Sequence, residues 1–326
     1  MCAHKNVRLF PRSRAVVGFA AIAATAALDM SLLAPVAAAG GVDDNHPQAE
    51  TCPDYVFLAA RGSDQNEEYG EYFGPQRYSE QGAESNGFEG PNLAALFHLV
   101  EQRHPGAMDN AYVLALDADA YPASMNLPPL AQEGENLRPL QLMRRLGGVL
   151  LEHPLHELVY QVTVGFVQSL RSGMNNAPRV VERYEEETGC SPRYIAAGYS
   201  QGAIIATSTE HYFASQGKLA GVIYLGNPLR RPGGMAGPVP RYLIPHSAAL
   251  PADRRIDYCL AGDFVCDFSL RNAKDALDTK AAHHASYFRD SQGDAAVEQD
   301  NARVADTVAG WLKSPGRVAA ILASHD

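Results

Sequence analysis

The sequence lacks the features that mark several large classes of protein. Beyond its N-terminal region, no segment holds roughly eighteen uninterrupted apolar residues, which argues against a protein with several membrane spans. It contains no Cys-x-x-Cys pair, and its histidines are not spaced as zinc ligands. Internal repeats and low-complexity tracts are absent too. The composition is that of a globular protein, with 46% hydrophobic residues.

Positive charge is also scarce. The chain has a formal net charge of −10, and its first 39 residues hold four basic residues and one acidic residue, so the remainder carries −13. An acidic domain does not favour nucleic-acid phosphates, and we expect no nucleic-acid partner. The remaining length, about 285 residues, suffices for one large α/β domain or two small ones.

The N-terminus has the composition of an export signal. Four basic residues within positions 5–14 precede an apolar stretch, and the alanines at 37–39 offer a cleavage site. A retained membrane anchor is the alternative, but Asp29 and Pro35 interrupt the apolar stretch. We predict that residues 1–39 are a signal peptide and that residues 40–51 are flexible. The mature protein is then expected to be extracellular, either free or associated with the cell envelope.

Four cysteines follow the signal peptide, an even number that suits disulfides in an oxidising compartment. They allow three pairings, and Cys259 with Cys266 is the easiest because these two are close in sequence. That pairing leaves Cys52 with Cys190, a bridge whose chain-entropy contribution is roughly 4–5 kcal/mol. Four free thiols are the alternative.

The most informative segment is Gly198-Tyr199-Ser200-Gln201-Gly202, a Gly-x-Ser-x-Gly pattern. Residues 194–197 before it predict a short buried strand, and residues 203–213 after it predict a helix. At such a strand-to-helix corner the serine hydroxyl is exposed, and the next backbone N–H can stabilise an oxyanion. A glycine-rich turn without chemistry is the alternative, but the flanking strand and helix favour a hydrolase.

Strands and helices alternate along the rest of the chain. The predicted strands are 55–60, 111–116, 221–225 and 255–259, and the predicted helices are 92–103, 140–150, 155–170, 177–187 and 301–312. Residues 62–90 predict a long loop. The alternation predicts an α/β fold of the three-layer α/β-hydrolase type, with a mostly parallel central sheet covered on both faces.

A nucleophilic serine needs a base and an acid that orients the base, and in hydrolases of this architecture the acid and then the histidine follow the serine. Asp263 is the preferred acid, because a disulfide between the two cysteines that flank it would fix its loop. The competing acids are Asp253, Asp257 and Asp267. The candidate bases are His283, His284 and His325, and periodicity does not separate the first two.

Several segments together resemble the cutinase family of serine esterases. They are Ala60-Arg61-Gly62-Ser63, Cys190 ahead of Ser200, the Gly198–Ala203 motif, and the Cys259–Cys266 loop with a later His-x-x-Tyr. The last pattern fits His284-Ala285-Ser286-Tyr287 and favours His284 over His283. The resemblance extends over residues 52–312 and implies one cutinase-like α/β-hydrolase domain there, followed by a tail at 313–326.

The resemblance implies a role for each matched residue. Ser200 would be the nucleophile, His284 the general base and acid, and Asp263 the residue that orients the imidazole. The backbone N–H groups of Ser63 and Gln201 would form the oxyanion hole. No metal and no organic cofactor is implied. We expect a monomer that acts on an ester or lipid substrate and makes transient contact with a lipid surface.

Two features depart from compact cutinases. The spacing between Asp263 and His284 is longer, and residues 125–165 look like a helical insertion. The insertion could cover the site as a lid, present an apolar surface to lipid, or pack as ordinary core. The function expected is a secreted esterase that hydrolyses carboxylic esters of apolar acyl chains through an acyl-serine intermediate. The alternatives are a lipase or phospholipase with a lid, an acyltransferase, and a non-catalytic envelope protein that retains the fold.

Overall fold

The fold is built around a five-stranded sheet in which every strand is parallel to its neighbours. The computed structural model describes residues 52–65, 74–124, 155–235, 248, 250–279, 282–291 and 293–313. The predicted signal peptide, the 40–51 segment and, apart from Lys313, the 313–326 tail lie outside the described residues.

The order of the strands creates a natural position for a binding site. From one edge to the other the sheet runs β2-β1-β3-β4-β5. The chain therefore starts in the sheet interior, moves outward to β2, and then crosses over to the other side of β1. In open parallel sheets, ligands bind beyond the carboxyl ends of the strands at the point where the order reverses, here between β1 and β3. The strands are β1 (Tyr55–Ala60), β2 (Ala111–Ala115), β3 (Arg193–Tyr199), β4 (Leu219–Leu225) and β5 (Arg255–Tyr258).

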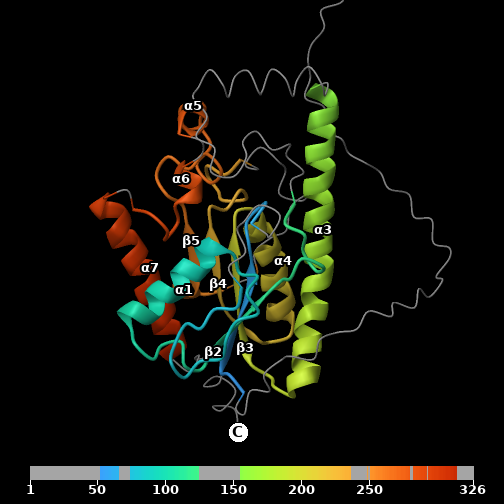
Figure 1. The fold of residues 1–326 in the computed structure, drawn as a ribbon, viewed down its shortest axis with the longest axis vertical. Coiled ribbons are helices and arrows are strands. Elements are labelled where there is room, and N and C mark those ends of the chain that lie inside the picture. Colours follow the sequence, from blue (N-terminus) through green and yellow to red (C-terminus); the bar gives the residue numbers. More distant parts are fainter. Residues whose placement is uncertain are drawn as a thin grey trace, which may run out of the picture. The chain divides into compact units, whose positions relative to one another are not determined.

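Helices cover both faces of the sheet. One buried core lies between the sheet and α1 (Pro91–Arg103) with α7 (Ala295–Lys313), and a second lies between the sheet and α3 (Leu155–Thr188) with α4 (Gln201–Ser215) (Figure 1). In β1 the odd-numbered residues belong to the first core and the even-numbered residues to the second. Because both faces are buried, such strands are continuous apolar runs in the sequence. The structure confirms the predicted three-layer α/β class.

Helix α3 corrects the sequence analysis. Two helices were expected at 155–170 and 177–187, whereas the structure has one continuous helix of 34 residues. The polar segment between them stays helical because it makes tertiary contacts: Ser172 Oγ and Asn176 Nδ2 both donate to the Ala120 carbonyl, at 3.0 and 3.2 Å. The separation into two helices was therefore wrong.

Most of the predicted insertion falls outside the described residues. Residues 125–154, including the helix expected at 140–150, are not among them. The last part of the insertion, residues 155–165, belongs to α3. Of the described helices, none combines the length and apolarity needed to cross a bilayer.

Three short elements were not expected from the sequence. They are the 3-10 turn η3 (Ala252–Arg254) and the helices α5 (Leu270–Asp278) and α6 (Ala282–Ala285). All three lie in the segments that flank or follow the edge strand β5.

Two disulfides are present, Cys52–Cys190 and Cys259–Cys266. The register of the sheet explains the first, because Tyr55 of β1 pairs with Arg193 of β3 and each cysteine lies three residues upstream of its strand residue. The second closes the short loop that follows β5.

Candidate active site

The candidate site residues gather at the carboxyl ends of the strands. Ser63 follows β1 and Ser200 follows β3, so these two flank the position where the strand order reverses. Asp263 lies in the disulfide-closed loop after β5, and His284 lies in α6. The fold thus brings together residues from four separate stretches of the chain.

Ser200 occupies a strained turn between β3 and α4. Its φ of 55° and ψ of −119° lie outside the regions that non-glycine residues ordinarily adopt. A Cβ at position 198 would lie 2.2 Å from the Gly202 carbonyl oxygen, and a Cβ at position 202 would lie 1.9 Å from the Ala60 carbonyl oxygen. Both glycines of the Gly-x-Ser-x-Gly pattern are therefore required by backbone contacts within the turn and with β1.

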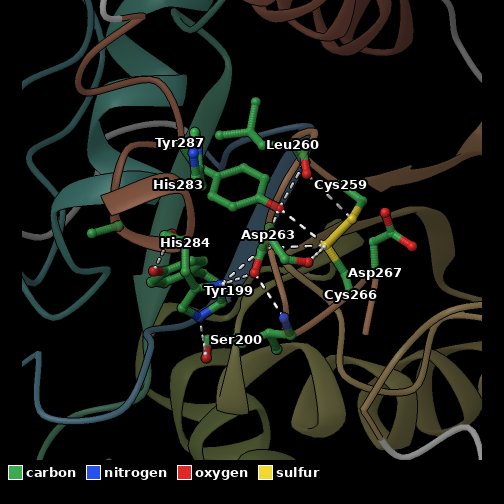
Figure 2. A network of polar contacts seen from close by, with 12 residues as sticks. Tyr199, Ser200, Cys259, Leu260, Asp263, Cys266, Asp267, His283, His284 and Tyr287 are labelled. Carbon is green, nitrogen blue, oxygen red and sulfur yellow. Dashed lines mark hydrogen bonds and ion pairs between the residues drawn. A yellow bond between two sulfur atoms is a disulfide. The ribbon is translucent and has the colours of Figure 1, made fainter. Parts of the chain in front are cut away.

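Ser200, His284 and Asp263 form a continuous chain of hydrogen bonds (Figure 2). The Ser200 Oγ lies 2.9 Å from His284 Nε2, and His284 Nδ1 lies 3.0 and 2.9 Å from the two carboxylate oxygens of Asp263. The Asp263 side chain is fully buried, while that of His284 retains 15% exposure. This is the arrangement of nucleophile, base and orienting acid that activates a serine hydroxyl.

Asp263 is held by donors on both carboxylate oxygens. The Val265 backbone N–H donates to Oδ1 at 2.9 Å, and the Tyr287 hydroxyl donates to Oδ2 at 2.7 Å. Tyr287 in turn accepts from the Leu260 N–H at 3.0 Å. Burial, followed by the Asp263 charge, raises the pKa of Tyr287 well above its ordinary value, so the phenol remains a donor.

The two adjacent histidines have different partners. Within the described residues, the ring nitrogens of His284 contact Ser200 and Asp263, not the competing acids Asp253, Asp257 and Asp267. His283 Nε2 instead lies 3.3 Å from Asp275 Oδ2 on α5. Tyr199 fixes His284 further, because its hydroxyl donates to the His284 carbonyl at 2.7 Å and the two rings stack at 5.1 Å. His325 lies outside the described residues.

The two predicted oxyanion residues lie side by side. Gln201 is the first residue of α4, where a backbone N–H has no partner inside the helix. Its side-chain Oε1 lies 3.5 Å from Ser63 Oγ and accepts from the Tyr121 hydroxyl at 2.9 Å, while its Nε2 donates to the Phe166 carbonyl of α3 at 3.3 Å. The Gln201 side chain therefore connects the turn after β1, the segment after β2, and α3.

Arg61 fixes the turn that carries Ser63. The guanidinium is 2% exposed and donates to the Leu116 and Tyr121 carbonyls at 2.5 and 2.7 Å. These bonds hold the segment after β2 against the turn after β1. Desolvation by burial lowers the pKa of Arg61 from its ordinary value.

Three further residues around Ser200, His284 and Asp263 have contacts that the sequence alone does not reveal. In the sequence Tyr287 is recognisable only as part of His-x-x-Tyr, and Tyr199 only as a variable position of the Gly-x-Ser-x-Gly pattern. Gly226, after β4, was missed: a Cβ there would lie 2.8 Å from His284 Cε1 and 3.2 Å from Asp263 Oδ2. Only its position after a strand as Gly-Asn-Pro hinted at a special turn.

Metal-ligating side chains approach one another at a single place in the described part of the chain. Cys259, Asp263 and Cys266 lie with their ligand atoms within 4.8 Å. Both sulfurs are joined in the disulfide, and a disulfide offers no thiolate to a metal ion. This grouping therefore does not fit a metal site.

Comparisons with known proteins agree with the resemblance noted in the sequence. Residues 156–299 match the family model described as Cutinase. The match spans Ser200, Gln201, Asp263 and His284 and begins downstream of Ser63. This match confirms that the chain resembles the cutinase family over residues 156–299. The search of curated proteins found no match.

The chain is also similar to several solved structures. A cutinase-like protein from Cryptococcus sp. is 17% identical, with 81% of this chain and 98% of that chain covered and a TM-score of 0.39. An acetylxylan esterase is 15% identical, with coverage of 80% and 100% and a TM-score of 0.41. A Trichoderma reesei cutinase in complex with a phosphonate inhibitor is 15% identical, with coverage of 81% and 78% and a TM-score of 0.38.

Proposed function

We propose that this protein is a secreted serine esterase that hydrolyses carboxylic esters of apolar acyl chains through an acyl-serine intermediate. One observation carries the proposal: His284 lies 2.9 Å from the Ser200 hydroxyl through Nε2 and 2.9 Å from Asp263 through Nδ1. The cutinase match supports the ester substrate class. The two disulfides and the composition of the N-terminus support secretion.

In the first half of the reaction, Ser200 Oγ attacks the ester carbonyl carbon while His284 Nε2 takes the hydroxyl proton. The imidazolium that forms donates from Nδ1 to Asp263, whose charge stabilises it. The carbonyl oxygen becomes an oxyanion, and the backbone N–H groups of Ser63 and Gln201 donate to it. When the tetrahedral intermediate collapses, the carbon–oxygen bond to the alcohol breaks, and His284 Nε2 gives its proton to the departing oxygen.

The second half repeats these steps with water. His284 Nε2 removes a proton from a water molecule as the water attacks the acyl carbon. The bond to Ser200 Oγ then breaks, Ser200 regains its proton from His284, and the carboxylic acid is released. The bonds that Val265 and Tyr287 donate to Asp263 support its role, because they hold the carboxylate oxygens in place beside His284 Nδ1.

The proposal is tested by replacing the nucleophile. Ser200→Ala should lower kcat on p-nitrophenyl esters by about 10⁴-fold or more. Ser215→Ala is the matched control, because this exposed serine at the end of α4 donates to the Tyr212 carbonyl of its own helix. A series of esters with increasing acyl length gives the preferred chain.

Covalent labelling supplies a second readout. An organophosphonate should label the wild type and Ser215→Ala at one serine and leave Ser200→Ala unlabelled. If Ser200→Ala keeps its fold and its esterase activity, the proposed function is wrong.

A further inference from the structure

A buried amide on α1 reaches the loop that carries the base. Asn92, the second residue of α1, is fully buried although it is polar. Its Nδ2 donates to the Ala285 carbonyl at 3.0 Å and to the Tyr287 carbonyl at 3.1 Å. These carbonyls belong to the residues just after His284. Asn92 therefore fixes the backbone on one side of the base, while the Tyr199 hydroxyl fixes the His284 carbonyl itself.

A second amide continues this connection to the turn after β1. Gln65 is 8% exposed, and its Nε2 donates to Asn92 Oδ1 at 2.6 Å. Its Oε1 accepts from the Gly62 N–H at 2.9 Å, directly before Ser63. A Cβ at position 90 would lie 2.7 Å from Gln65 Oε1, so the glycine there leaves room for this side chain.

The bonding of the two amides is directional. Asn92 Nδ2 donates both hydrogens to residues 285 and 287, in the segment 284–287 that we call the histidine loop, and Asn92 Oδ1 accepts from Gln65. Gln65 Oε1 in turn accepts from the backbone of the segment 61–65 after β1, which we call the Ser63 turn. Buried amides are tolerated when their groups are paired, and these pairings join two loops more than two hundred residues apart in the sequence. Flipping Asn92 would turn its oxygen toward two carbonyls, and flipping Gln65 would turn its nitrogen toward the Gly62 N–H, so either flip would break this pattern.

We propose that Gln65 and Asn92 are positioning residues that set the distance between the histidine loop and the Ser63 turn, which carries a predicted oxyanion-hole N–H. This inference rests on the proposed function. The pair acts through backbone: Asn92 holds the loop that aims His284 Nε2 at Ser200, and Gln65 holds the Gly62–Ser63 peptide. Neither side chain touches the reacting atoms. Disrupting the pair should impair the chemical step and leave substrate binding intact, because a misplacement of about 1 Å can cost up to about 10²-fold in rate.

The test uses neutral substitutions of similar shape. Asn92→Leu removes the bonds to both carbonyls, and Gln65→Met removes the bond to the Gly62 N–H. We expect kcat to fall about 10- to 100-fold in each variant with KM within about twofold of the wild type. The double variant should lose no more than the worse single variant, because the two residues act as one unit.

The matched control is Asn86→Leu. Asn86 also bonds backbone, donating to the Ala115 carbonyl and accepting from the Ala115 N–H, both at 2.8 Å, but its partner lies at the end of the edge strand β2. A purely structural role predicts a lower Tm and unchanged kcat for all three variants, and this result would overturn the proposal. If Asn92→Leu does not fold, Gln65→Met carries the test, because it leaves both Asn92 bonds to the histidine loop in place.

A spectroscopic readout separates this inference from the proposed function. The proton between His284 Nδ1 and Asp263 should give a far-downfield NMR resonance that disappears in His284→Gln. We expect it to move or broaden in Asn92→Leu and to stay in place in Asn86→Leu. A wild type without Ser200-dependent turnover would refute the proposed function, whereas an unmoved resonance in Asn92→Leu would refute the positioning role.

Discussion

Replacing Gly226 with alanine should displace the imidazole of His284. The new Cβ would lie 2.8 Å from His284 Cε1 and 3.1 Å from Nδ1. Carbon atoms in contact prefer about 3.5–4.0 Å, so the ring must move by roughly 0.7 Å or more. Since about 1 Å of misplacement can cost up to about 10²-fold, we expect kcat on p-nitrophenyl esters to fall roughly 10- to 100-fold.

A second glycine provides the control for backbone strain. Gly226 has a φ of 56°, and Gly217, after α4, has a φ of 67° but open space around it, because no atom of the described residues lies within 4 Å of where its Cβ would be. Both alanine variants should lose about 1–2 kcal/mol of stability from the left-handed backbone, measured by urea unfolding. Only Gly226→Ala should lose activity. Equal kcat values for the two variants would refute the steric reasoning.

Two further predictions concern stability. Burial raises the pKa of Glu89, whose Oε1 accepts from Ser85 Oγ at 2.6 Å. The contribution of Glu89 to stability is therefore complete below pH 4.5, its ordinary pKa, and is lost as pH rises through the raised pKa. The stability of Glu89→Gln relative to the wild type should accordingly increase with pH. A difference in the free energy of unfolding that stays constant across pH would contradict this. The fully buried Glu210 accepts from Arg255 Nη2 at 2.5 Å. Glu210→Ala should lower the free energy of unfolding by about 3 kcal/mol, because it leaves the Arg255 guanidinium without its carboxylate partner. Glu84→Ala, which breaks a half-exposed ion pair, should cost less than about 1 kcal/mol in the same assay and serves as the comparison.

The central strands could be predicted closely because their signal is local. The strand expected at 55–60 has the bounds of β1, since a strand buried on both faces is an uninterrupted apolar run. The Gly-x-Ser-x-Gly turn could be predicted for a similar reason, because its two glycines and Ser200 form a pattern within five consecutive residues. In both cases the pattern that carries the prediction lies within a few positions of the chain.

Features set by distant contacts could not be predicted in this way. A break was expected at residues 171–176, whereas the bonds of Ser172 and Asn176 to the Ala120 carbonyl, remote in sequence, help to hold this segment within α3. The requirement for glycine at 226 comes from His284 and Asp263, which are remote in sequence. Periodicity could not choose between His283 and His284, because their partners lie on other elements.

The exposed helix α5 was missed for a different reason. Its N-terminal cap is visible in the sequence as Ser269 followed three residues later by Asn272, whose N–H donates to the serine hydroxyl at 3.0 Å. The helix carries few apolar residues, and its first residue, Leu270, is 87% exposed. Its apolar residues do recur at helical spacing, at positions 270, 273, 276 and 277, but a segment of nine residues gives this signal too few repeats to stand out.

Because β5 lies at the edge of the sheet, the two parts of the candidate site differ in their local stability against unfolding. Ser63 and Ser200 emerge from β1 and β3, which have strands on both sides, whereas Asp263 and His284 depend on segments beyond a four-residue strand with one neighbour. Segments with fewer sheet contacts open at lower free energy than the centre of a fold. Mild heating should therefore displace His284 and Asp263 while the sheet that carries Ser200 is still folded. The protein should then lose its esterase activity at a lower temperature than the one at which it unfolds.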